Sequence, residues 1–204
     1  LAIAGIAVST VSLPILSKLI KSKKTYQANK IQINSLELSL LLSLPASIAL
    51  IIGSNEIVNA LFGYGSFTVN DIEQTSLALK FFGYGIPAFA VLKIFANFFF
   101  ARDNTITPFK ISSIVVIINI VISVLFFKKI GFIIIPIATT LSAWIGVLHF
   151  LYLLLKTGYL KIEPKFYTKL TKIIFSTLIM SYIFHNSLNY FAKNLSYSSD
   201  YKIL

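Results

Sequence analysis

The sequence contains no cysteine and little charge, and both absences narrow the classes of protein that it can encode. Without cysteine there is no disulfide framework, no thiolate zinc site and no cysteine nucleophile. Charged residues make up 12% of the 204 residues, about half of the roughly 25% found in soluble domains. Hydrophobic residues make up 56%, and the mean hydropathy is +0.83. Most of the surface must therefore face lipid, which predicts an integral membrane protein.

Histidine and acidic residues are also scarce, which argues against an enzyme. The two histidines, His149 and His185, are too few for a histidine-rich metal site. The seven acidic residues lie nearly all between the apolar runs. The sequence also lacks the HExxH, GxSxG and P-loop patterns. We therefore expect no catalytic residue, no prosthetic cofactor and no enzymatic activity.

The net charge of +11 comes almost entirely from lysine. These lysines lie between the apolar runs and form no stripe on a polar face. That distribution follows the positive-inside rule and is not typical of a nucleic-acid-binding surface, so nucleic acid is not an expected partner. The chain opens at Leu1 inside an apolar run, without a methionine or a charged signal-peptide region. We therefore expect a fragment of a longer protein.

Six apolar segments are candidates for membrane-spanning helices, each of which needs about 20 residues. They are residues 1–20, 36–53, 77–101, 111–127, 131–155 and 170–191. The predicted fold is therefore an all-α polytopic transmembrane bundle of about six spans, with no soluble domain. Twelve of the 18 basic residues lie in the connections after the first, third and fifth spans, which predicts that these connections are cytoplasmic. The other connections hold only Lys128, Lys129, Lys193 and Lys202.

The connections also carry helix-end signals. Ser54 is predicted to open a short helix that ends at Phe62. Thr68 is followed three residues later by an acidic residue, which is the spacing of a capping box. Thr107 is followed by Pro108, which predicts a helix capped by Thr107 with the proline in its first turn.

Proline lies inside four of the predicted spans. A proline leaves a backbone carbonyl without its donor, and in lipid that carbonyl must find another partner. Transporters use such breaks as hinges, but a static kink explains them equally well from the residues alone. The four prolines are Pro14, Pro45, Pro87 and Pro136. Gly83 and Gly85 precede Pro87, so the third span holds the best hinge candidate.

Lys93 is the most informative charge, because it lies nine residues before Arg102, or about 13 Å along a helix. A lysine at that depth either lines a polar cavity suited to an anionic phosphate or snorkels through a gap between helices. Lys80 lies nearer the outer interface, where snorkelling is the favoured interpretation.

Buried polar side chains are predicted in the fourth and fifth spans. Asn119, Thr139, Thr140 and Ser142 lie at membrane depth. Their ordinary role is interhelical hydrogen bonding. The alternative is that Asn119 and Thr139 supply oxygen ligands to a coupling sodium ion, although no carboxylate accompanies them.

Three short stretches resemble motifs of one family. They are LPILS at 13–17, LFGYGSF at 61–67 and FFARDNTITP at 99–108. In this order and at these spacings they are similar to the LPxLS, LFxxGxF and FYARQDTxTP motifs of the MurJ (MviN) lipid II flippases, a family of the MOP exporter superfamily. Lys93 also lies where that family keeps a lysine. The departures are Phe100 for tyrosine and Asp103-Asn104 for Gln-Asp, which displaces the loop carboxylate by one position.

The resemblance implies the C-terminal lobe of a transporter that works by alternating access. Its substrate would be lipid II, an undecaprenyl-pyrophosphate-linked peptidoglycan precursor, moved from the inner to the outer leaflet of the bacterial inner membrane. Lys93 and Arg102 would then be candidates for binding the anionic headgroup. Membrane lipids and an N-terminal lobe of the same protein would be further partners, and a sodium ion or the membrane potential would supply the energy. The alternatives are another MOP exporter, of polysaccharide lipids or drugs, and a non-transporting remnant of a split gene.

Overall fold

The computed structural model describes the backbone of residues 3–199 and the side chains of residues 5–190, and every element in this part of the chain is helical. A π-helical turn, Ile3–Ala7, precedes the first α-helix. The helices are α1 Val8–Lys21, α2 Thr25–Ile52, α3 Ser54–Phe62, α4 Val69–Phe100, α5 Ile106–Ile130, α6 Ile134–Lys156 and α7 Pro164–Ser199, with a 3₁₀ turn η2, Gly131–Ile133, between α5 and α6. The predicted all-α bundle is confirmed.

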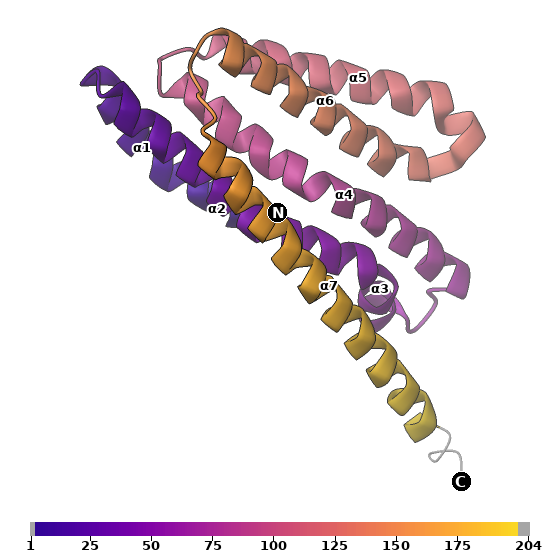
Figure 1. Ribbon diagram of the computed structural model, residues 1–204. Helices are drawn as coiled ribbons and strands as arrows, with labels where there is room; N and C mark the ends of the chain where they lie inside the picture. Colours follow the sequence, from indigo (N-terminus) through magenta and orange to yellow (C-terminus); the bar gives the residue numbers. More distant parts are fainter. Residues whose placement is uncertain (1–2, 200–204) are drawn as a thin grey trace.

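Three stretches of the described chain are long and apolar enough to cross a membrane. Two are α2 and α4, and the third is the 51 residues of Ile106–Lys156. That third stretch contains both α5 and α6, which turn back on each other through η2 (Figure 1), so it includes two of the predicted spans. α1 has only 14 residues, and α7 is long but less apolar. The six span boundaries stay predictions.

Two of the three predicted helix-end signals are present. α3 covers the predicted Ser54–Phe62. The capping box at the start of α4 is complete, because Thr68 Oγ1 accepts from Asp71 N at 3.2 Å and Asp71 Oδ2 accepts from Thr68 N at 2.9 Å. The Thr107 cap was a wrong prediction.

α5 begins two residues earlier than that cap required, at Ile106 instead of Pro108, and its N-cap residue, Thr105, makes no side-chain bond. The carboxamide of Asn104 replaces the expected hydroxyl, since its Oδ1 accepts from Thr107 N at 3.0 Å. The Thr-Pro pair therefore predicted the start of a helix in the correct connection, but it predicted the wrong capping side chain.

α4 is the centre of the bundle. It packs against α2 on one side and α6 on the other, while α5 packs mainly on α6 (Figure 1). Small side chains such as Ala88 and Ala90 are buried along it and let its neighbours approach. Only Pro108 and Ile111 of α5 are buried, so the other faces of this helix are apolar and exposed, as expected of a helix in contact with lipid.

α7 contacts a single neighbour. Among the described elements it packs only against α2, and Figure 1 shows it running past the end of the bundle. A short connection, residues 157–163, joins it to α6. α7 is therefore the least enclosed of the long helices.

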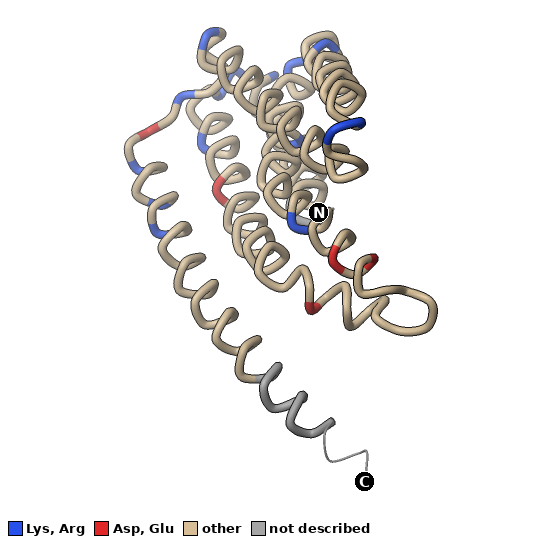
Figure 2. Tube along the Cα trace, turned by 90° about the vertical axis from the view of Figure 1, so that its right-hand side faces the viewer, with Lys and Arg blue, Asp and Glu red and all other residues tan. Residues whose placement is uncertain are grey.

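Charge is separated along the bundle. Figure 2 shows many of the basic residues gathered near the end where α1, α4 and α6 finish, whereas acidic residues mark the opposite end around α3. The basic end contains the turn after α1, the α4–α5 turn and the α6–α7 connection. The three connections that the positive-inside rule assigns to one side of the membrane therefore lie at one end of the bundle, and the cytoplasmic orientation of that end stays a prediction. Lys202, which was counted in that prediction, lies outside the described residues.

Candidate functional site

Lys93 lies on α4 beside a cavity of about 770 Å³ between α4 and α5. The walls are mostly apolar and come from α4, the first turns of α5 and one side chain of α6. They include Phe89, Leu92, Phe100, Phe109 and Phe150. α4 and α5 make few contacts with each other, so the cavity is a wedge between two helices that diverge from their common turn.

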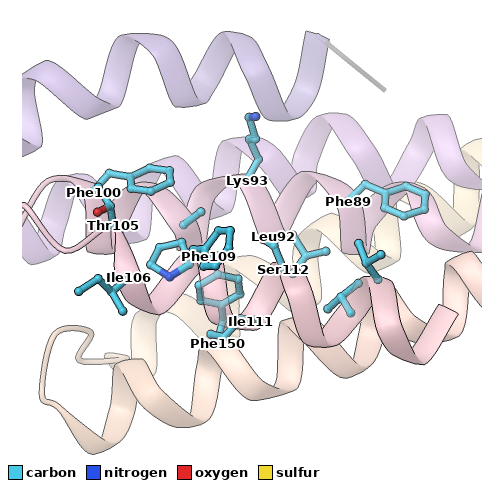
Figure 3. A pocket seen from close by; sticks show the side chains of 14 residues that line it. Phe89, Leu92, Lys93, Phe100, Thr105, Ile106, Phe109, Ile111, Ser112 and Phe150 are labelled. Atoms are coloured by element: carbon cyan, nitrogen blue, oxygen red, sulfur yellow. The ribbon is translucent and has the colours of Figure 1, made fainter. Parts of the chain in front are cut away.

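The ammonium group of Lys93 points out of this cavity. Lys93 is one of the residues that line the cavity, and Figure 3 shows its side chain extending away from the other labelled residues, which places its nitrogen at the rim. Lys93 is exposed, and within residues 5–190 it has neither an ion-pair nor a hydrogen-bond partner. An unpaired cation beside an apolar cavity can bind a ligand that has both an anionic and an apolar part.

Arg102, the second predicted headgroup residue, is bound within the protein. Its Nη2 donates to Tyr159 O at 3.0 Å and its Nη1 donates to Phe98 O. The guanidinium carbon also lies 4.2 Å from the centre of the Tyr159 ring, within cation–π distance. Burial lowers the pKa of this guanidinium below its ordinary value, and the nearby Tyr159 partly opposes the shift.

Two carboxamides from α2 complete this arrangement, which we call the Arg102 junction (Arg102, Tyr159, Gln32 and Asn29). Gln32 is fully buried; with its carboxamide oriented so that the nitrogen faces Tyr159 O, it donates to that carbonyl at 2.9 Å and accepts from Arg102 Nη1 at 3.1 Å. Asn29 accepts from Lys161 N and donates to Lys161 O, both at 2.9 Å. The junction therefore joins α2, the α4–α5 turn and the α6–α7 connection. It does not bring Arg102 to the cavity beside Lys93.

The three residues of the predicted hinge lie in the middle of α4, which is one continuous helix from Val69 to Phe100. The two glycines serve close approach. A Cβ on Gly83 would lie 2.8 Å from a side-chain carbon of Ile51 on α2, and one on Gly85 would lie 2.9 Å from Thr140 Oγ1 on α6. α2 and α6 therefore pack closely against α4 from two sides just before Pro87.

Asn119 and Thr139, the predicted sodium ligands, are in direct contact. Asn119 Nδ2 donates to Thr139 Oγ1 at 2.9 Å, and that hydroxyl donates to Ile135 O at 2.7 Å. Ser123 Oγ donates to Asn119 Oδ1 at 3.3 Å. The oxygens are those that sodium prefers, but all are neutral and paired with one another. Neither α5 nor α6 contains Asp or Glu, so these residues alone fit a buried cation poorly.

Several residues of these sites were not singled out from the sequence. Gln32 and Asn29 bond to backbone groups that lie far away in sequence, and Tyr159 binds the distant Arg102 through its carbonyl and its ring. Ser47 on α2 was missed as well, although one signal was available. Serine recurs every four residues at 35, 39, 43 and 47, which places the four side chains on one helix face. All four serines are buried.

Comparisons with known proteins show which family this chain resembles. A family model described as "Lipid II flippase MurJ" matches residues 1–204. A probable lipid II flippase MurJ of Rickettsia prowazekii (strain Madrid E) is 39% identical over 151 residues, which cover 73% of this chain and 30% of the relative. A probable lipid II flippase MurJ of Rhizobium tropici is 31% identical over 180 residues, which cover 88% of this chain and 34% of the relative. The chain therefore spans about a third of the length of these curated relatives.

The backbone arrangement has a solved counterpart. A structure described as "Lipid II flippase MurJ, inward closed conformation" matches with a TM-score of 0.65 and 27% sequence identity. The match covers 90% of this chain and 44% of that one. The similarity thus extends along nearly the whole chain and includes its fold.

Proposed function

This chain belongs to the lipid II flippase MurJ family, and from that membership we propose that it is part of a transporter for lipid II. In this proposal the parent protein moves the lipid-linked peptidoglycan precursor from the inner to the outer leaflet of the bacterial inner membrane, for cell wall biogenesis. The chain supplies one lobe, and the remainder of the parent protein supplies the other wall of the transport path. Membrane lipids surround both.

One observation of this chain carries the proposal, namely Lys93 at the rim of the apolar cavity between α4 and α5. A lipid-linked pyrophosphate combines an anionic headgroup with a long apolar tail. A path for it needs a cation within a low-dielectric region, where a single charge acts strongly, and apolar surfaces beside it. Lys93 and the aromatic walls of its cavity combine these properties. Arg102 supports the lobe by holding its helices together.

The energy for transport is proposed to come from a sodium gradient or from the membrane potential. The potential acts on the charged headgroup itself, at about 2.3 kcal/mol per elementary charge for 100 mV. Sodium would need a site, and Asn119, Thr139 and the Ile135 carbonyl are the oxygens that this chain offers. Because these oxygens are neutral, a counter-charge from the rest of the protein would have to accompany the ion.

The direct test is transport by the full-length parent protein. It would be reconstituted in vesicles that carry fluorescently labelled lipid II, and transfer between leaflets would be followed by quenching from one side. We expect transfer to exceed that of protein-free vesicles and to respond to an imposed sodium gradient or potential. A parent protein that is folded but transfers no lipid II, and that fails to restore growth in a flippase-depleted strain, would contradict the proposal.

A further inference from the structure

The middle of α4 contains carbonyl groups that bond to side chains of neighbouring helices. Pro87 has no N–H, so Gly83 O, four residues earlier, lacks its intrahelical donor. Ser47 Oγ of α2 donates to this carbonyl at 2.8 Å. Ser47 therefore replaces the bond that the proline removes, which is how such breaks are satisfied in lipid.

Two further carbonyls in this part of α4 accept hydrogen bonds from α6, on the side of α4 opposite to α2. Tyr84 O lies in the turn against which the proline ring presses, and it accepts from Trp144 Nε1 at 3.1 Å. Phe81 O accepts from Thr140 Oγ1 at 2.8 Å. Thr140 and Trp144 lie four residues apart on α6, so both donors belong to one face of that helix.

We infer that Ser47, Thr140 and Trp144 are positioning residues that together set the course of α4 at Pro87 and thereby the place of Lys93. They form what we call the three-donor clamp. Their bonds come from helices on opposite sides of α4, and the missing side chains of Gly83 and Gly85 allow both helices to come close enough. The clamp thus holds the segment in which the sequence predicts a hinge.

A small change in the direction of α4 at the three-donor clamp would displace Lys93. Lys93 lies six residues beyond Pro87, or about 9 Å along the helix axis. A change of about 10° in the direction of α4 at the proline would therefore move the lysine backbone by roughly 1.5 Å. If α4 bends between transport states, which rests on the proposed function, we expect one or more of the three bonds to break in that step.

The serine stripe of α2 supplies a matched control. Ser43 lies one turn before Ser47 on the same face and is fully buried, but its hydroxyl has no hydrogen-bond partner within the described part of the chain. Ser43→Ala and Ser47→Ala therefore remove the same atom from neighbouring positions of the same helix face. Only the second change takes a donor away from α4. On α6, Thr140→Val removes the hydroxyl, whereas Thr140→Ser retains it.

The test is hydrogen exchange of the full-length protein in lipid nanodiscs, followed by mass spectrometry of peptides from α4. We expect Ser47→Ala and Thr140→Val to speed exchange around residues 81–91 by about three- to twentyfold, the range that measured interhelical hydrogen bonds in membranes imply. Ser43→Ala and Thr140→Ser should leave exchange there within about twofold of the wild type, and peptides of α5 should not respond to any of the four.

Two results would overturn the inference. In one, Ser47→Ala and Ser43→Ala behave alike. In the other, faster exchange spreads evenly along α2 and α4, as it would if the bonds merely held the two helices together. Exchange requires no substrate, so the outcome is independent of whether the parent protein transports lipid II. A parent protein that moves no lipid II but shows the expected exchange pattern would contradict the function and leave the clamp in place.

Discussion

The guanidinium of Arg102 lies 4.2 Å above the ring of Tyr159 and donates to the carbonyl of that same residue at 3.0 Å. The stacking and the hydrogen bond fix one residue of the α6–α7 connection against the end of α4. Gln32 reaches the same carbonyl from α2. Three segments that are distant in sequence are therefore held by one planar cation, whose fork of donors a lysine cannot reproduce.

The first prediction concerns this junction. Arg102→Ala should lower the free energy of unfolding of the full-length protein by about 1–3 kcal/mol, because Tyr159 O and the buried Gln32 lose a half-buried charged donor. Arg102→Lys should recover only part of that loss. Thermal unfolding in detergent measures the effect, with Lys110→Ala, an exposed basic residue of the next helix, as the control. A variant that unfolds normally but binds lipid II poorly would instead favour the headgroup role.

The second prediction concerns Lys93. Lys93→Ala should reduce transport by the full-length protein about tenfold or more, because hydrogen bonds to charged groups are worth about 1.5–3 kcal/mol. The thermal midpoint should stay near that of the wild type, since Lys93 has no partner within residues 5–190. Lys80→Ala on the same helix is the matched control. Normal growth of a flippase-depleted strain that carries Lys93→Ala would rule out the cavity role.

The sequence predicts those parts of the fold that depend on residues close together in the chain. Apolar length located α2, α4, α5 and α6, because the hydrocarbon core sets a minimum length for each span. It did not give their ends. α2 starts at Thr25, well before the apolar run, since a helix continues into the interface wherever its polar side chains find partners. The capping box and the ends of α3 were predicted correctly because the residues that set these helix ends lie within a few positions of each other.

The site was harder to predict for the opposite reason. Arg102 near a membrane interface has the sequence pattern of a ligand residue, but its partner Tyr159 lies 57 residues further along the chain. Ser47 and Gly83 are 36 residues apart. Such bonds depend on how helices pack, and periodicity within one helix does not reveal which carbonyl a hydroxyl will meet. The three motifs identified the family, but they could not assign these contacts.

The third prediction concerns the attachment of α7. Lys169 Nζ lies 2.6 Å from Glu37 Oε2, and the Glu37 side chain is only 14% exposed. Because α7 packs only on α2 among the described elements, Lys169→Gln should leave Glu37 without its counter-charge and weaken the docking by about 1–2 kcal/mol, between the values for exposed and buried pairs. Trypsin cleavage after Lys161, in the connection to α7, measures this weakening.

Two further variants make that experiment specific. Lys165→Gln removes an exposed charge from the same helix and should leave the cleavage rate unchanged. The exchange of charges in Glu37→Lys with Lys169→Glu should restore part of the protection that either single change loses. If the double variant is cleaved as fast as the sum of the single effects predicts, the two side chains do not stabilise each other.

The fourth prediction separates the two roles of Asn119. As a joint between α5 and α6, Asn119 contributes through its bond to Thr139, so Asn119→Ala should cost about 0.6–1.7 kcal/mol in any salt. As a sodium ligand it would add a second effect, because an ion that binds only the folded state raises stability with its concentration.

We expect sodium, compared with potassium at equal ionic strength, to raise the thermal midpoint of the full-length wild type. Asn119→Ala should abolish that difference, and Ser142→Ala, which alters only a local bond within α6, should retain it. Equal midpoints in the two salts for the wild type would mean that these oxygens of α5 and α6 only connect the two helices and do not bind sodium. The membrane potential would then be the remaining energy source for the proposed transport.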